Sequence, residues 1–314
     1  MLDNVKKQYI IVAKINNKKG TREVVILKKL RNMLNGGIFL LPTVLVLAVI
    51  VAIPFIISFY LSLTGWNGVS STMEFVGLNN FLELFTKAKF FDSLWFTLRI
   101  SLVIVLFVNV AGTLLAELLT YGLKSSKFFR AAYYLPNTMG GIVIGFIWLF
   151  IFVQGFPAIG KATGIGLFEL QWLGTEGTAF WGLVIVACWQ SIGFVMLVMI
   201  AALSGVPQDI IEAAYMDGAG YWRVFFKIKL PNCIPYISTC LFWTISLTFK
   251  MFDLNMSLTN GGPFGSTTSI SQLIYQDAFF NNRYGFATAE ALLFFIVLFV
   301  ITSAQNAITR KKEG

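Results

Sequence analysis

Histidine, the side chain most often used for acid–base chemistry near neutral pH, is absent from the 314-residue chain. Its absence excludes a Ser-His-Asp triad and nearly all zinc sites. The three cysteines, Cys188, Cys233 and Cys240, form no Cys-x-x-Cys pair, and each falls in an apolar run. We interpret them as small core residues. The sequence therefore predicts neither a catalytic centre nor a metal site.

One segment, GFPAIGKA from Gly155 to Ala162, comes close to the phosphate-binding P-loop pattern. Ala162 stands where the pattern needs a hydroxyl for magnesium, and Pro157 removes an amide that would contact phosphate. No strand precedes the segment. We interpret it as a turn that follows a helix, so the chain carries no visible ATPase and no cofactor is expected.

The composition indicates a membrane protein. Apolar residues make up 57% of the chain and charged residues only 12%, whereas soluble domains average about 45–50% and about 25%. So few charges cannot coat a water-facing surface of this size. The net charge is +9, and the Lys and Arg residues that produce it lie between long apolar runs rather than in polar patches. This pattern argues against nucleic-acid binding and for a membrane protein.

Six apolar runs are long enough to cross a bilayer, which takes about 20 residues. The sequence therefore predicts an all-α membrane protein with six transmembrane helices, at 37–63, 94–119, 138–154, 179–203, 233–250 and 288–308. A further run with few charges, 254–276, contains Gly-Gly-Pro and many Ser and Thr residues, so we expect a structured loop there.

The orientation follows from the positive charges. Eighteen of the 24 Lys and Arg residues fall in the two tails and in the loops after the second and fourth helices. Because positive residues concentrate on the cytoplasmic side, both termini are expected in the cytoplasm. Residues 1–36 are expected to form a basic tail, either disordered or partly a surface helix, ahead of a membrane domain at 37–308 and a short tail at 309–314.

Two further features have structural interpretations. Gly141 and Gly145 stand four apart on the third helix, a spacing that favours close helix packing. Arg99, Glu117 and Glu290 lie near helix ends, where we expect them to reach lipid headgroups or to pair within the bundle rather than to form a proton pathway.

The fourth loop, residues 204–232, predicts a pair of short helices on the cytoplasmic face. Pro207 suits the first position of a helix, and Gly218 suits the left-handed turn that ends it. A second helix is expected from Tyr221 to Ile228, ending before Leu230. The pair carries several apolar and aromatic side chains, which are typical of a docking surface for a soluble partner.

This loop resembles the signature loop of ATP-binding-cassette importer permeases, E-A-A, three residues, G, nine residues, I-x-L-P. The matching residues are Glu212, Ala213, Ala214, Asp217 beside the turn, Gly218, Ile228, Leu230 and Pro231. The segments FDLNMSLTNGGP (252–263), YQDAF (275–279), YGFATAEA (284–291), SLTGWNG (62–68), FVGLNNF (75–81) and FFRAAYYLP (128–136) are similar to the carbohydrate-uptake subgroup. The resemblance covers nearly everything from about residue 37 onward.

The resemblance implies a type I importer permease in the bacterial cytoplasmic membrane. The expected partners are a second related permease, two copies of a cytoplasmic ATPase that contact these loops, and an extracytoplasmic sugar-binding protein, besides membrane lipid. ATP-driven closure of the ATPase pair would switch the bundle between inward-open and outward-open states.

Sugar contacts are expected at mid-depth, where hydroxyl groups and an apolar ring face need polar and aromatic side chains. On the fourth helix these are Trp189, Gln190, Ser191 and Phe194, and on the fifth Thr244 and Thr248, which share one helix face. The chain is similar to the larger permease of the maltose and glycerol-phosphate systems. In the maltose permease the sugar contacts lie on the same two helices, although its residue types differ at several of these positions. The alternative interpretation is ordinary packing between helices, where Ser and Thr are common.

Two other functions stay open at the level of sequence. A permease of the same family for phosphate esters, amino acids or peptides is one, although an anionic substrate favours buried Arg or Lys, which the mid-depth positions lack. The other is an ion-coupled secondary carrier, which needs a charged relay inside the membrane and no EAA loop.

Overall fold

The computed structural model describes residues 40–121 and 125–310, and most of this part of the chain is helical. Within it there is no β-strand, only a single bridge between Thr64 and Phe75. The chain divides into two compact units, residues 1–60 and 61–314. The expected basic tail, 1–36, and most of the short tail at 309–314 lie outside the described residues.

The first unit contains most of the first apolar helix. This helix runs over Leu40–Ser62 and includes a π-helical turn, η1 (Ala48–Ala52), followed by α2 (Ile53–Ser62). Its length and hydropathy suffice to cross a bilayer, in agreement with the predicted helix at 37–63.

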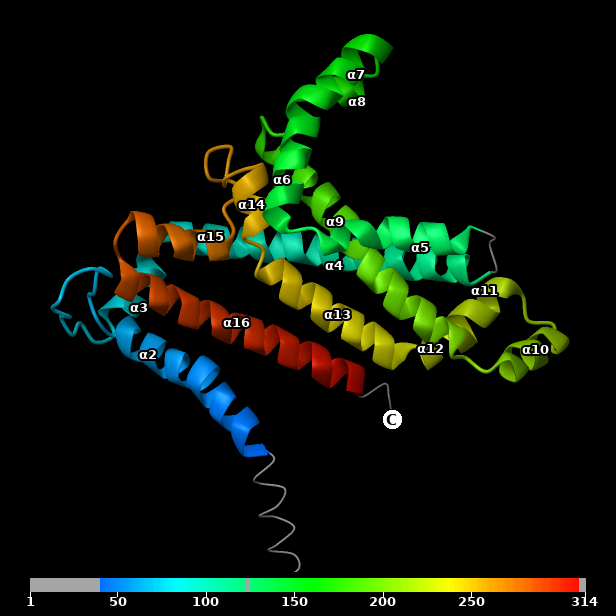
Figure 1. The fold of residues 1–314 in the computed structure, drawn as a ribbon, viewed down its shortest axis with the longest axis horizontal. Coiled ribbons are helices and arrows are strands. Elements are labelled where there is room, and N and C mark those ends of the chain that lie inside the picture. The colour runs from blue at the N-terminus through cyan, green and yellow to red at the C-terminus, as the bar shows by residue number, and fades with distance from the viewer. Residues whose placement is uncertain (1–39, 122–124, 311–314) are drawn as a thin grey trace, which may run out of the picture. The chain divides into compact units, whose positions relative to one another are not determined.

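The second unit contains the other five predicted helices, and Figure 1 shows α4, α9, α13 and α16 running alongside one another. Four of the five are long enough to span a membrane, and α13 is a shorter apolar helix. They are α4 (Ala88–Thr120), α6 (Gly141–Phe150) with its continuation η3 (Ile151–Gly155) and α7 (Phe156–Thr163), α9 (Glu176–Ser204), α13 (Ile234–Phe249) and α16 (Tyr284–Arg310).

Short helices connect the long ones. They are α3 (Asn79–Thr86), α5 (Ser126–Tyr134), η2 (Leu135–Thr138), α8 (Gly166–Glu169), α10 (Gln208–Met216), α11 (Tyr221–Val224), η4 (Phe225–Lys229), α12 (Leu230–Asn232), α14 (Asp253–Leu258), α15 (Ile270–Tyr275) and η5 (Gln276–Phe280). The segment 254–276 thus contains most of α14 and all of α15, with a loop at 259–269 between them. It has no helix long enough to span a membrane, in agreement with the expected structured loop.

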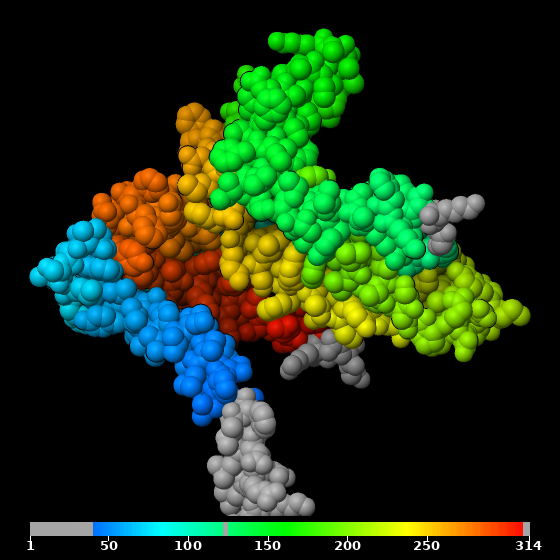
Figure 2. Space-filling model, viewed as in Figure 1, coloured from blue at the N-terminus to red at the C-terminus, as the bar shows by residue number. Residues whose placement is uncertain are grey.

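The predicted end of the third helix is wrong. The segment that resembles a P-loop is not a turn but part of the helix that runs on to Thr163, and Gly164, with a φ of 70°, ends it. Pro157 does not break the helix because it lies in the first turn of α7 after the π-helical segment. Figures 1 and 2 show α7 and α8 projecting away from the long helices of this unit.

The second short helix of the fourth loop also extends further than predicted. Helical backbone continues from α11 through η4 into α12, so Leu230 and Pro231 lie inside it instead of ending it. Pro231 lies just after the π-helical turn η4, where the regular hydrogen-bond ladder of the α-helix is already interrupted. Pro207 precedes α10 by one residue, so it is the capping residue rather than the first helical one.

The core of the second unit forms where α9 packs against α4 and α13. Val195, Met196 and Met199 of α9 and Ile104 and Val108 of α4 are fully buried within it. Close approach depends on glycine at Gly112, because a Cβ there would lie 2.8 Å from the Val195 side chain. The packing therefore agrees with the rule that small residues let membrane helices approach.

The glycine spacing on α6 serves the predicted purpose. A Cβ at Gly141 would lie 3.0 Å from Asp253 Cβ, and one at Gly145 would overlap the Ser257 hydroxyl. These two partners lie on α14, so Gly141 and Gly145 bring α6 and α14 into contact.

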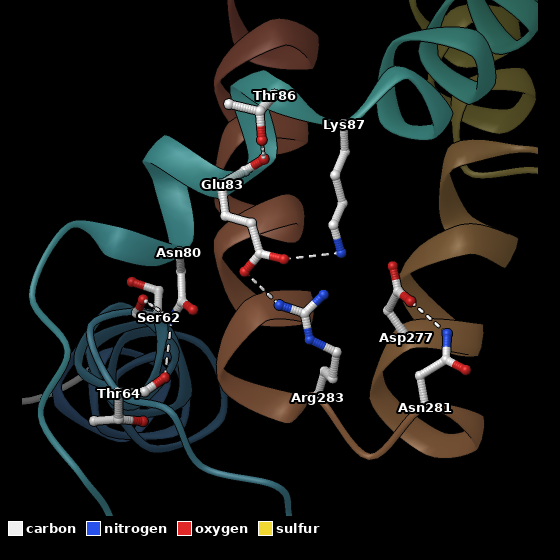
Figure 3. Close-up of polar contacts among 9 residues, drawn as sticks. All are labelled: Ser62, Thr64, Asn80, Glu83, Thr86, Lys87, Asp277, Asn281 and Arg283. Carbon is white, nitrogen blue, oxygen red and sulfur yellow. Dashed lines mark hydrogen bonds and ion pairs between the residues drawn. The ribbon is translucent and has the colours of Figure 1, made fainter.

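A polar network ties α3 to the start of α16 (Figure 3). Glu83 pairs with Lys87 at 2.9 Å and with Arg283, and Asn80 donates hydrogen bonds to the carbonyls of Ser62 and Thr64. Burial raises the pKa of Glu83, but hydrogen bonds from Lys87 and Arg283 outweigh it and hold the pKa below 4.5. The carboxylate is therefore ionised at neutral pH.

Candidate functional site

A cavity of about 230 Å³ lies between α9, α13 and the start of α14. Three of the six residues predicted to contact substrate line it, namely Gln190 and Ser191 of α9 and Thr248 of α13. The other lining residues are Gly141, Ala187, Leu247, Lys250, Met251, Phe252, Asp253 and Leu254. The structure thus brings together polar side chains that lie 57 or more residues apart in the sequence.

Two of the polar side chains of the cavity are oriented by hydrogen bonds to backbone carbonyls. Gln190 Nε2 donates to the Met139 carbonyl at 3.2 Å, and Thr248 Oγ1 donates to the Thr244 carbonyl at 2.9 Å. Gln190 is half-buried, and Ser191 and Thr248 are buried. Oriented amide and hydroxyl groups of this kind suit a neutral ligand that is rich in hydroxyls.

The other three predicted contact residues do not line the cavity. Thr244 is fully buried, donates to the Cys240 carbonyl and accepts from Asn109 Nδ2. Phe194 stacks on Trp243 with ring centroids 4.0 Å apart. Trp189 is 41% exposed and packs edge-on against Trp148. In this structure Thr244 therefore connects α13 to α4, and Phe194 connects α9 to α13. Trp189 packs against α6 instead of lining the cavity.

Two charged residues of the cavity were not predicted. Lys250 ends α13 and Asp253 begins α14, so the turn between the two helices places both at the cavity wall. Neither is among the residues expected from the sequence to contact sugar. The signal that was available was a pair of opposite charges three residues apart directly after an apolar helix.

The fourth loop forms a compact unit that we call the knuckle, α10 to α12. Gly218 lies at its turn with a φ of 77°, as predicted, and the amides of Asp217, Gly218 and Ala219 bond back to carbonyls of α10. Figure 1 shows the knuckle at the opposite end of the long helices from α15 and η5. This placement agrees with a knuckle on one membrane face and the 254–276 loop on the other.

Most of the residues that match the signature loop of importer permeases lie at the surface of the knuckle. Glu212, Ala213, Asp217, Gly218 and Pro231 are exposed, while Ala214, Ile228 and Leu230 are half-buried against the core. Large apolar side chains are also exposed here, with Met216 at 87% and Trp222 at 60%. An exposed apolar patch outside the membrane-crossing helices is typical of a protein–protein contact.

No metal centre accompanies these features. Across residues 40–121 and 125–310, no group of three His, Cys, Asp or Glu side chains lies close enough together to hold a metal ion.

The comparisons with known proteins establish the family. Residues 108–314 match the family described as binding-protein-dependent transport system inner membrane component. The chain belongs to this family. It is therefore a multi-pass protein of the bacterial inner membrane and a transport component rather than an enzyme.

Relatives match over most of the length. A probable starch degradation products transport system permease protein of Thermoanaerobacterium thermosulfurigenes is 43% identical, over 91% of this chain and 98% of the relative. A multiple sugar-binding transport system permease protein of Streptococcus mutans is 33% identical, over 91% and 99%. A chain in the crystal structure of a bacterial ABC transporter for alginate has a TM-score of 0.77 at 22% identity, over 91% and 98%. This last likeness establishes the type I importer permease fold.

Proposed function

We infer that this chain is the permease subunit of an ATP-binding-cassette importer and forms half of the pathway for a sugar or oligosaccharide. The observation that carries this inference is the family match, together with relatives of which one is named for starch degradation products. The cavity between α9 and α13 is compatible with it, because the Gln190 amide and the Ser191 and Thr248 hydroxyls can hydrogen-bond to a polyol, and the Lys250 ammonium and Asp253 carboxylate at the cavity wall can do the same.

Gln190, Ser191 and Thr248 are the proposed substrate contacts in this structure. The cavity is smaller than the roughly 300–1,000 Å³ of most ligand sites, so a sugar needs further space. A second, related permease facing this chain would supply it. Trp189, Phe194 and Thr244 would reach the sugar only after α9 and α13 move.

The partners are proposed from the knuckle and the family. Two copies of a cytoplasmic ATPase would bind the exposed surface around Glu212 and Ala213, one on each permease. An extracytoplasmic binding protein would deliver the sugar to the other face. The distribution of positive residues supports a cytoplasmic location for both termini and the knuckle. ATP-driven closure would then move the knuckles and switch access to the cavity.

Reconstitution tests this function directly. The complex of this chain with its second permease and ATPase is placed in proteoliposomes with the binding protein and ATP, and uptake of radiolabelled maltotriose is measured. Uptake should require both ATP and the binding protein. Uptake of a labelled amino acid or glycerol phosphate instead, with none of maltotriose or other sugars, would refute the sugar assignment.

A further inference from the structure

A buried ion pair joins the knuckle to α4. The Lys229 ammonium of η4 lies 2.7 Å from Oε1 of Glu117, which is near the end of α4. The two side chains are only 11% and 3% exposed. Few charged side chains in proteins are buried to this extent unless they are paired.

Two tyrosines enclose the pair. Tyr221 of α11 donates its hydroxyl to the same Glu117 oxygen at 3.2 Å, and the Lys229 ammonium lies 5.1 Å from the centre of the Tyr121 ring. Burial, with the neighbouring Tyr121 and Glu117, raises the pKa of Tyr221, so its hydroxyl keeps its proton and acts as a donor. One carboxylate of α4 therefore holds both α11 and η4.

We propose that Glu117 and Lys229 are positioning residues that make the knuckle and the cytoplasmic end of α4 move as one body during transport. The proposal rests on the proposed function, since it assumes that an ATPase displaces the knuckle. A buried ion pair contributes little net stability because desolvation offsets the attraction, but breaking it by removing one partner is strongly unfavourable. Such a pair fixes a geometry more than it stabilises a fold.

The motion would reach the cavity through α4. Gly112 of α4 lies against Val195 of α9, and Asn109 of α4 donates to Thr244 of α13 at 3.2 Å. These contacts lie within two to three turns of Glu117 along the same helix. Displacement of the knuckle would therefore shift α9 and α13, the two helices that carry Gln190, Ser191 and Thr248.

The test uses four variants in the full complex with its second permease, ATPase and binding protein. Glu117→Gln and Lys229→Met each leave one buried partner alone. The double variant removes both charges. Lys227→Met is the matched control, because Lys227 lies in the same η4 segment but is exposed.

The first measurement is maltotriose imported per ATP hydrolysed, corrected for the amount of assembled complex. We expect the ratio to fall by about five- to tenfold in both single variants, at the lower end of typical couplings between sites, and to stay at the wild-type value in Lys227→Met. The double variant should recover normal assembly, since no lone charge is buried, yet keep the low ratio. A double variant with both normal assembly and the wild-type ratio would overturn the proposal.

The second measurement does not depend on which solute is carried. Spin labels at Arg223→Cys on the knuckle and Leu106→Cys on α4, both exposed sites, report their separation with and without ATP. A single narrow distance should persist in the otherwise wild-type protein and broaden in Glu117→Gln. An unchanged, narrow distance in Glu117→Gln would also overturn the proposal, whereas failure of maltotriose uptake in the wild-type complex would count against the sugar assignment alone.

Discussion

Gly218 occupies a backbone conformation that other residues rarely adopt. Its φ of 77° is in the left-handed region, while Gly220, two residues on, has a φ of −74°. A Cβ at either position meets open space. The two glycines therefore differ in backbone strain and not in crowding.

This difference predicts unequal effects of the same substitution. Gly218→Val should strain the turn by about 1–3 kcal/mol and displace the knuckle, while Gly220→Val should be tolerated. Sugar-stimulated ATP hydrolysis by the complex should fall in the first variant with no loss of the protein from the membrane. Normal transport by Gly218→Val would show that the turn does not matter for coupling.

Gln190 tests the cavity. Gln190→Ala removes an oriented amide and should reduce sugar uptake about tenfold, in line with ~1.4 kcal/mol for lost hydrogen bonds, while assembly and basal ATP hydrolysis persist. Trp189→Ala, one residue away, changes a side chain that does not line the cavity in this structure. We also expect Trp189→Ala to reduce uptake, because Trp189 would contact the sugar once α9 and α13 have moved to the outward-facing state. Loss of uptake in Trp189→Ala with normal uptake in Gln190→Ala would contradict the cavity assignment.

Glu83 gives the network between α3 and α16 a pH dependence. Because the pKa of its carboxyl is lowered in the folded chain, its contribution to stability is present above the unfolded value and is lost as the pH falls through the lowered one. Wild type should exceed Glu83→Gln in thermal stability in detergent at pH 7, by less than ~1 kcal/mol for such exposed pairs. The difference should vanish well below pH 4.5. A difference that persists at pH 2 would contradict this.

At the scale of elements, the contact between α6 and α14 depends on Gly145. Gly145→Ala places a methyl group where the Ser257 hydroxyl lies and should destabilise the protein by about 1–3 kcal/mol, as overpacking does. Gly140→Ala is the matched control, because a Cβ there meets nothing within 4 Å. The measurement is the midpoint of thermal unfolding in detergent. Equal midpoints for the two variants would show that α14 can shift away from the added methyl group without loss of stability.

The sequence predicts where apolar helices lie and where Gly218 turns the chain, because hydropathy and backbone conformation act locally. It fails at the helices that run through Pro157 and Pro231, because local rules mark proline as a stop, whereas each of these prolines follows a π-helical turn that already interrupts the hydrogen-bond ladder. The cavity is predicted only in part, because some of its residues carry a local signal in the sequence and others do not. Gln190 and Thr248 are visible as polar residues in apolar helices, but Lys250 and Asp253 reach the cavity only through a turn that depends on tertiary packing.

At the scale of the whole molecule, the chain depends on partners for energy. The segment most similar to a P-loop is helical and ends in a left-handed glycine, Gly164, so its amides are used within the helix and cannot surround a phosphate. The purified chain alone should therefore neither bind nor hydrolyse ATP, and should co-purify with an ATPase from its own membrane. ATP turnover by the isolated chain, freed of ATPase, would contradict the dependence on a partner ATPase.

The stack of Phe194 on Trp243 favours the arrangement of α9 and α13 that this structure has. The rings belong to α9 and α13, so these helices cannot separate at that level without pulling the rings apart. Aromatic pairs contribute about 0.5–1.5 kcal/mol beyond their buried area. This amounts to roughly two- to tenfold in the population of the arrangement in which the two rings are stacked. So small a difference shifts a population and does not lock the bundle. Separation of α9 from α13 should change the surroundings of the Trp243 indole and shift its fluorescence.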